Sequence, residues 1–470
     1  MSASEKIIDF LVRLHPVFKK PLEEIPNWKK LRNTIIILTA FALFSEVPLP
    51  YINQSVAYRL QTLQYIVGSS LGTLMSTGIG PVILGTLFVE IMYVAKTKAF
   101  RNLDLKSEEG RRKYMRYVMA STIFFLFAEG VVTAYRISIH TPTAILINSV
   151  LITIGGYIAL LMVEYLKQYG LLSGISLFVM YRVSKSIFAS LFNPLSTNAG
   201  MYLPAGKVAQ LFYYIYGLAT NKQDIVNMFT GYLGPMVIMP ILGTIALWLI
   251  VNYLYKVKVT MRDIASSEKR EYSLLMQTVM PIIFGVSIVM FLQYILITVN
   301  GFIHSTTLET VINYLSTPFG YLSWSDKVWW LVYTIVFAVP AIIVSYLFAV
   351  RLTDEKIFVE YYDYYGTIDY PGKTKFRKGF AKRYNIFLMR IRLINRLLPF
   401  YSAVIIVILA LIGNALGVAA GGSGIILAVA IAEYIKKYLD NIAKNDKNPN
   451  YNDAWGLFKY TLKRMFTQSE

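Results

Sequence analysis

The chain has 470 residues, of which 56% are hydrophobic, and its mean hydropathy is +0.50. This apolar length exceeds what one soluble core uses, so the composition predicts a polytopic membrane protein. Cysteine is absent and only three histidines are present, which excludes disulfides and argues against a metal centre, a cofactor or an enzyme built on such groups. The net charge of +19 does not by itself indicate a nucleic-acid partner, because in a membrane protein the lysines and arginines are first assigned to the two sides of the membrane.

Residues 1–32 contain the tract KIIDFLVRL, in which Ile7, Ile8, Leu11 and Leu14 recur at helical spacing beside charged residues. This pattern predicts a short amphipathic helix on the inner surface of the membrane. We expect no removable signal peptide, because the segment has no apolar core bounded by a cleavage site.

Apolar segments then recur along the chain, and we predict an all-α membrane protein with ten transmembrane helices. The predicted spans are residues 33–50, 72–95, 114–135, 143–166, 171–192, 233–255, 276–299, 328–350, 399–417 and 422–439. With the N-terminus inside, most of the 46 Lys and Arg residues fall on the inner side. The positive-inside rule therefore predicts a multi-pass protein of the cell membrane with both termini in the cytoplasm.

The long outer segment 193–232 divides the spans into two groups of five. Because each group has an odd number of spans, the second group enters from the opposite side, which predicts two inverted five-helix halves. The predicted units are an amphipathic segment 1–32, an N-terminal half 33–192, an external connection and hinge region 193–232, a C-terminal half 233–439 and a cytoplasmic tail 440–470.

Two stretches near the first spans are unusual. The segment 55–71 is too short and mixed to span, so it lies on the outer surface or folds back as a re-entrant half-helix surrounded by protein. The next stretch, Gly72–Ala95, is rich in glycine and reads as one membrane helix packed closely against its neighbours. Within it Ile79 and Ile83 are four residues apart, which places them on one helix face, toward lipid or toward a pore.

Two inner loops, 256–275 and 351–398, are basic, and the second is long and aromatic. The long loop is either an orientation signal with snorkelling arginines or a docking surface for a polyanion. The residues alone leave both interpretations open.

Four tracts resemble the SecY family, the pore subunit of the protein-conducting channel, and its archaeal branch in particular. They are LGTLMSTGIGP (71–81), KQYGLLSGISLF (167–178), NYLSTPFG (313–320) and NALGVAAGGSGIILAVAIAEY (414–434). The resemblance implies an hourglass pore closed at mid-membrane by a ring of aliphatic side chains. By motif, this ring would comprise Ile79, Ile83, Ile175, Val179, Ile283 and Leu427.

The same resemblance assigns further roles. The segment 55–71 becomes a re-entrant plug helix with Val56, Leu60, Leu63, Ile66 and Val67. Unfolded polypeptides would cross through the ring, and transmembrane segments would leave through a lateral gate that includes Ile83, Glu90, Val279 and Ile283. A hydrophobic constriction of this type blocks ions by dewetting.

The implied partners are a SecE-type and a beta-type small membrane subunit, signal sequences, nascent polypeptides, the lipid bilayer and the ribosome. Arg262, Arg377 and Arg383 in the basic inner loops are the candidate ribosome contacts. No catalytic residue, cofactor or metal is expected.

The sequence also departs from the family. Glu90 stands where the family usually has a neutral amide, and Val279 lies in a TVMP tract that lacks the family's asparagine near the gate. These changes suggest a divergent or second copy with a different threshold for signal sequences.

Other charges lie in or beside the predicted spans. We expect Glu129 and Glu164 to pair structurally, and Glu433 to mark an interface. Arg182 either lines an outer vestibule or pairs with Glu129.

Two rival functions remain at this stage. A secondary transporter would also suit ten spans, inverted halves and intramembrane charges, but it requires charge to converge at the seam between the halves. The second rival is an insertase that uses the lateral gate without passing a chain across the membrane.

Overall fold

The computed structural model describes residues 3–53, 72–97, 107–139, 141–194, 206–220, 234–262, 269–275, 305–316, 400–413, 416–419, 421–445 and 453–467, with isolated residues between these ranges. Outside the described residues lie the predicted plug residues Val56, Leu60, Leu63, Ile66 and Val67, the gate residues Val279 and Ile283, and the loop residues Arg377 and Arg383. The predicted spans 276–299 and 328–350 also fall almost entirely outside them.

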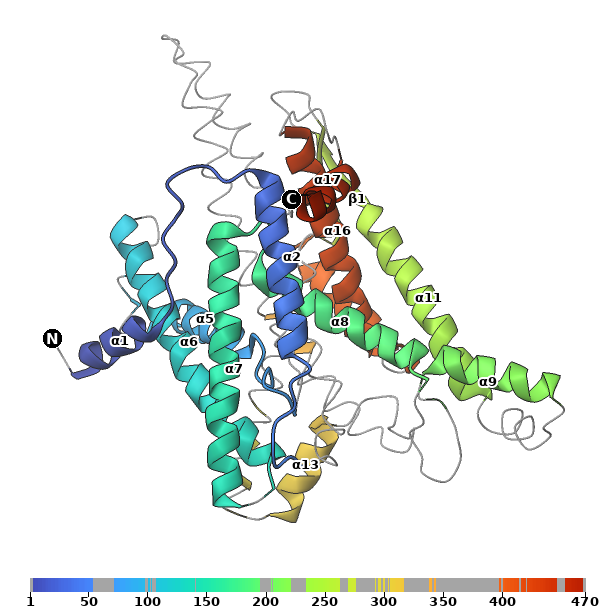
Figure 1. Ribbon diagram of the computed structural model, residues 1–470, viewed down its shortest axis with the longest axis horizontal. Helices are drawn as coiled ribbons and strands as arrows, with labels where there is room; N and C mark the ends of the chain where they lie inside the picture. Colours follow the sequence, from blue (N-terminus) through green and yellow to red (C-terminus); the bar gives the residue numbers. More distant parts are fainter. Residues whose placement is uncertain are drawn as a thin grey trace, which may run out of the picture.

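The N-terminal half is helical (Figure 1). Its helices are α1 (Ala3–Leu14), α2 (Asn27–Phe44), α5 (Gly80–Val94), α6 (Glu108–Ile137), α7 (Pro142–Tyr169) and α8 (Gly174–Phe192). They confirm the predicted amphipathic helix and a helix at each of the first five predicted spans. The bounds of the first span were wrong, because α2 begins in a polar turn directly after Pro26 and ends before the prolines at 48 and 50.

The stretch Gly72–Ala95 is not one helix. Residues 72–79 form irregular turns, and α5 begins only at Gly80, with Pro81 in its first turn. Gly72 and Gly78 have φ values of +83° and +52°, in the left-handed region where glycine carries no steric penalty. We interpreted the glycines of this stretch as sites of close helix packing. Gly72 and Gly78 instead lie in the turns that precede α5.

The residues after the N-terminal half contribute further helices to the described part of the chain. They are α9 (Lys207–Ala219), α11 (Gly234–Lys256), α13 (Thr306–Ser316), a helix at Phe400–Gly413, α16 (Gly421–Asn445) and α17 (Ala454–Thr467). α9 lies within the predicted external connection, and α17 lies within the predicted tail. Both were missed as helices from the sequence.

The described part of the chain is helical apart from one two-stranded antiparallel hairpin, which the sequence did not predict. Strand β1 (Lys258–Arg262) pairs with β2 (Lys269–Ser273), and Lys258 lies opposite Ser273. Because Val259 and Met261 alternate with polar residues, the sequence has the two-residue period of a strand. The hairpin was not predicted, because the loop 256–275 was interpreted from its basic charge and not from this alternation.

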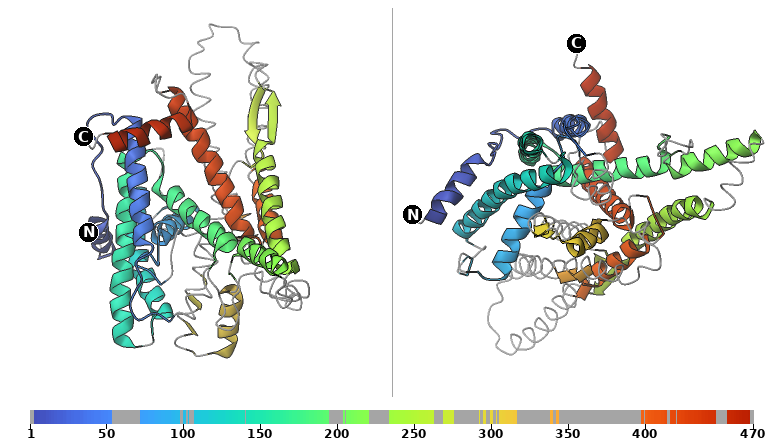
Figure 2. Two further views of the ribbon diagram at one scale, coloured as in Figure 1. Left: turned by 45° about the vertical axis from the view of Figure 1, so that its right-hand side comes forward. Right: turned by 90° about the horizontal axis from the view of Figure 1, so that it is seen from below.

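Within the described ranges, four helices are long and apolar enough to cross a membrane: Glu108–Ile137, Pro142–Tyr169, Gly174–Phe192 and Val237–Lys256. Two shorter apolar helices are Gly80–Tyr93 and Phe400–Gly413. α5, α6 and α7 pack in sequence order, α8 packs against both α7 and α16, and α11 packs against α16 and α9 (Figure 2). α8 and α16 therefore carry the contact between the two halves near the middle of the bundle.

Candidate functional site

The structure places the described members of the predicted ring in one continuous apolar core. Ile79, Ile83, Val179 and Leu427 are buried members of this core, and Ile175 is partly buried against it. The relative exposures of Ile79, Val179 and Leu427 are 0%, and that of Ile83 is 5%. These five residues are here called the aliphatic set. Four of them lie on α5, α8 and α16, and Ile79 directly precedes α5; the sixth predicted member, Ile283, lies outside the described residues.

The irregular segment 72–79 brings Ile79 to the start of α5. The segment is held on one side by backbone hydrogen bonds from Leu49 N to Gly72 O at 3.0 Å and from Leu74 N to Val47 O at 2.9 Å. On its other side, Gly155 of α7 lies against the Leu74 carbonyl, and a Cβ at Gly155 would sit 1.9 Å from that oxygen. Ile79 therefore depends on a backbone path that is fixed from two sides.

α8 is positioned by a small residue and by an aromatic stack. Gly174 lies against Val163 of α7, where a Cβ would meet the Val163 Cα at 3.1 Å. Phe178 stacks on Phe41 of α2 with ring centroids 4.0 Å apart. These contacts orient the face of α8 that carries Val179 toward the apolar core.

α16 is positioned by the glycines at its start. Gly422 lies so close to the helix at Phe400–Gly413 that a Cβ on it would be 2.3 Å from the Ala410 carbonyl oxygen. A Cβ on Gly413 would lie 2.4 Å from the Gly422 Cα. The glycine-rich tract before Leu427 therefore allows two helix backbones to touch.

The buried charges do not meet at the aliphatic set. Glu90, on the predicted gate helix α5, is 4% exposed and accepts a 2.6 Å hydrogen bond from the Tyr114 hydroxyl of α6. Glu129 and Arg182 are both buried, at 4% and 7%, but none of the ion pairs between described residues joins them, which argues against the alternative in which Arg182 pairs with Glu129. Burial also argues against Arg182 as a residue that lines an open vestibule.

Glu164 does pair structurally, as predicted. Its Oε1 lies 3.4 Å from Lys167 Nζ at the end of α7. Glu433 lies half-buried on α16, and its predicted interface role stays a prediction. In the described part of the chain, no group of three or more His, Asp or Glu residues is placed to hold a metal ion.

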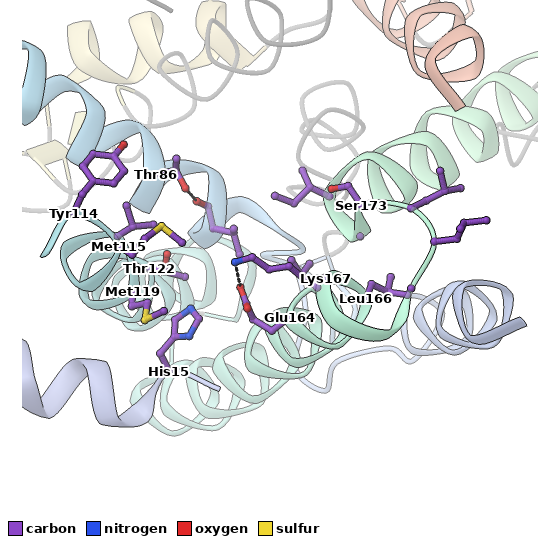
Figure 3. Close-up of a pocket in the computed structure, with 18 of the residues that line it drawn as sticks. His15, Thr86, Tyr114, Met115, Met119, Thr122, Glu164, Leu166, Lys167 and Ser173 are labelled. Atoms are coloured by element: carbon purple, nitrogen blue, oxygen red, sulfur yellow. Dashed lines mark hydrogen bonds and ion pairs between the residues drawn. The ribbon is translucent and has the colours of Figure 1, made fainter. Parts of the chain in front are cut away.

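A cavity of about 500 Å³ opens beside Ile175 (Figure 3). Apolar residues of α5, α6 and α7 line it together with Tyr114, Glu164 and Lys167, and His15 closes one side. Burial lowers the pKa of His15 below the usual range, although Glu164 acts in the opposite direction. This cavity and the Tyr114–Glu90 hydrogen bond had no signal in the sequence, because their residues lie far apart along the chain.

Arg262 ends β1, so the structure places this candidate ribosome contact on the hairpin. Its predicted partners in the long loop, Arg377 and Arg383, lie outside the described residues.

Comparisons with known proteins cover almost the whole chain. A family model described as SecY matches residues 73–435. The chain is 28% identical over 455 residues to the protein translocase subunit SecY of Sulfolobus acidocaldarius, an alignment that covers 90% of this chain and 94% of the relative.

Solved structures share the fold. A structure of a protein-conducting channel aligns with a TM-score of 0.70 at 22% identity, and covers 93% of this chain and 98% of that one. Sec61 from the canine ribosome-channel complex of the endoplasmic reticulum aligns with a TM-score of 0.68 at 22% identity over the same shares. The family match runs from the irregular segment before α5 into α16, and so includes every residue of the aliphatic set. The chain belongs to the SecY family of protein translocase subunits.

Proposed function

We propose that this translocase subunit closes its polypeptide path with the aliphatic set at the seam between its two halves. The observation that carries the proposal is the burial of these aliphatic side chains, from α5, α8 and α16, in one apolar core. An aliphatic constriction excludes water and ions, yet its side chains separate around an extended chain without forming fixed hydrogen bonds. Such a seal passes polypeptides irrespective of sequence.

Family membership favours a channel over the rival secondary transporter, and the distribution of charge agrees. A transporter needs polar groups that converge on a substrate near the midplane. Here Glu90 is bonded to Tyr114 on the neighbouring helix, and Glu129 has no ion-pair partner among the described residues. The described acidic groups are therefore dispersed, whereas the aliphatic residues are gathered.

The proposal extends to the gate and the plug. We infer that α5 forms one edge of a lateral gate, with Ile83 and Glu90 on it and Val279 and Ile283 on the opposite edge. The segment 55–71 would be the plug, and the ten spans would form two inverted halves. Apolar segments would leave through the gate into lipid, since their transfer free energy favours the bilayer.

Partners and orientation follow from the family and the charge distribution. The Lys and Arg bias supports cytoplasmic termini in a cell membrane, with the hairpin that carries Arg262 on the same side. Because the structural neighbour Sec61 was solved in a ribosome-channel complex, we propose the ribosome as a partner at this surface. Small SecE-type and beta-type membrane subunits would complete the assembly.

The seal is tested by ion conductance in planar bilayers. Ile83→Ser should raise the resting conductance, because a hydroxyl allows water into the constriction. Ile91→Ser is the matched control, since Ile91 lies on the same helix but is 46% exposed. Equal conductance of the two variants and the unaltered chain would contradict the assignment.

Passage of polypeptide is tested by crosslinking. The chain has no cysteine, so single cysteines at Ile83 and at Ile91 report without background. A stalled translocating chain should crosslink to position 83 and not to position 91. Absence of crosslinks at both positions with every stalled substrate would argue against the proposed path.

A further inference from the structure

The C-terminal helix α17 returns across the molecule to the N-terminal half. It follows α16 in sequence and lies beside the first turns of α2, as Figures 1 and 2 show. α16 begins in the predicted C-terminal half and α17 lies in the tail that follows it, whereas α2 belongs largely to the predicted N-terminal half. α17 therefore bridges the seam at the end of the bundle where α2 begins.

A separate apolar cluster forms this bridge. We call it the tail cluster, and its buried residues are Trp28 and Leu31 of α2, Leu171 of the α7–α8 turn, Ala443 of α16 and Leu457 of α17. Leu457 and Thr461 are 0% exposed on one face of α17, while Trp455 on the opposite face is 61% exposed. The helix thus buries a defined stripe and does not lie loosely on the surface.

Cation–π contacts and a hydrogen bond at the start of α17 further fix how this helix lies against α2 and α16. The Arg464 guanidinium lies 5.0 Å from the Trp28 ring centroid, and Arg32 of α2 lies 5.7 Å from the same ring. At its start, α17 is attached to α16, because the Ala454 amide donates to Asp440 Oδ1 at 2.9 Å. α17 is therefore fixed to α16 at one end and packed on α2 along its length.

A second connection between the halves lies at the other end of the bundle. The end of α8 and the start of α9 meet at a corner, where the Gly206 amide donates to the Asn193 carbonyl at 2.9 Å, and α9 packs against α11. A Cβ at Gly206 would lie 2.5 Å from the Asn193 nitrogen, so the corner is tightly closed. In the right panel of Figure 2, α17, α8 and α9 lie along one side of the bundle and α5 lies on the other.

The resemblance to the SecY family implies a first hinge at the connection 193–232, where the α8–α9 corner lies. We propose that the tail cluster is a second hinge point, paired with that corner. This inference rests on the proposed function, in which the halves part at the α5 edge. One attachment point lets two bodies pivot in any direction, whereas two points on the same edge define an axis. With α17 in place, the halves swing apart at the gate while the tail cluster stays intact.

A crosslink distinguishes a hinge from a latch. Trp28→Cys with Arg464→Cys, joined by a short bifunctional thiol reagent, locks α17 to α2 in a chain that has no other cysteine. A hinge predicts that the locked channel still translocates a reporter polypeptide at close to the rate of the reduced, unlinked variant. Loss of translocation on locking would mean that α17 must release, and would overturn the proposal. Trp28→Cys with Trp455→Cys is the control pair and should not link, because Trp455 faces away.

Removal of the cluster gives the complementary test. Leu457→Asp places a charge in the tail cluster and should raise the resting ion conductance severalfold, whereas Lys459→Ala on the exposed side should not change it. Unchanged conductance of Leu457→Asp would also overturn the proposal. If Leu457→Asp fails to fold, the crosslinking result still decides. Failure of the unaltered chain to translocate at all would instead count against the proposed function.

Discussion

Gly155→Ala tests how the irregular segment 72–79 is supported. The added Cβ would lie 1.9 Å from the Leu74 carbonyl oxygen, whereas real Cβ contacts are at least 3.0 Å. The segment or α7 must therefore move by about 1.1 Å, the difference between those distances. The obstructing atoms belong to the backbone, so no side-chain rotation relieves the clash.

Two effects of opposite sign compete in this variant. Alanine is a better helix former than glycine by about 1 kcal/mol, which stabilises α7. Overpacking of a close contact costs about 1–3 kcal/mol. We expect the upper part of this range, because the nearest atoms are the backbone atoms of Leu74, which cannot move aside by rotation of a side chain. We expect a net loss of up to about 2 kcal/mol in the free energy of unfolding. Because the displaced segment carries Met75 and Ile79, both 0% exposed, the resting conductance should also rise.

Thermal unfolding in lipid nanodiscs and conductance in planar bilayers measure the two outcomes. Gly243→Ala in α11 is the matched control, because its new Cβ meets only side-chain atoms of Val418 and Leu416, at 3.1 and 3.3 Å. Those side chains can shift by a few tenths of an ångström, so this variant should unfold at or slightly above the temperature of the unaltered chain. A Gly155→Ala protein that is equally stable and equally tight to ions would refute the reasoning.

Three further changes are informative. Tyr114→Phe removes the 2.6 Å donor to buried Glu90 and should cost about 1.5–3 kcal/mol, seen as a lower melting temperature, whereas Tyr117→Phe should have little effect. Burial lowers the pKa of His15, so the undocked N-terminal segment binds more protons and docking weakens as the pH falls through the range below about 6.5. Hydrogen exchange at residues 14–19, corrected for intrinsic rates, should therefore increase at low pH, and His15→Gln should abolish the dependence. Gly206→Ala should lower the melting temperature, because its Cβ would meet the Asn193 backbone at 2.5 Å; an unchanged temperature would show that the α8–α9 corner yields freely.

The aliphatic set shows what a linear pattern can provide. The four-residue spacing of Ile175 and Val179 fixed a common face on α8, and the structure turns that face toward the core. The spacing of Ile79 and Ile83 predicted that both side chains share one face, and both are buried in the same apolar core. This holds although Ile79 precedes α5, because Ile79 directly adjoins the first turn of the helix. The role of these residues as a ring remains a prediction.

The errors have a common physical cause. Apolarity identifies a segment that avoids water, but it does not separate a helix from a buried turn, so the break at Gly78 was hidden inside Gly72–Ala95. In α17, Leu457 and Thr461 recur at helical spacing on one face. The partner that buries this face is α2, which lies more than 400 residues earlier in the sequence. The Tyr114–Glu90 bond likewise exists only once α5 and α6 lie side by side.

The hairpin has a mechanical consequence. Only Val257 separates α11 from β1. Its amide donates to the Leu254 carbonyl of α11 at 3.2 Å, and its carbonyl accepts from the Leu274 amide after β2 at 3.0 Å, so hydrogen bonds hold this residue to both elements. Figure 2 shows the strands continuing beyond the end of α11 as a projecting arm. A force applied to the tip of that arm would therefore act directly on α11, a helix long and apolar enough to cross a membrane, because no flexible linker lies between them.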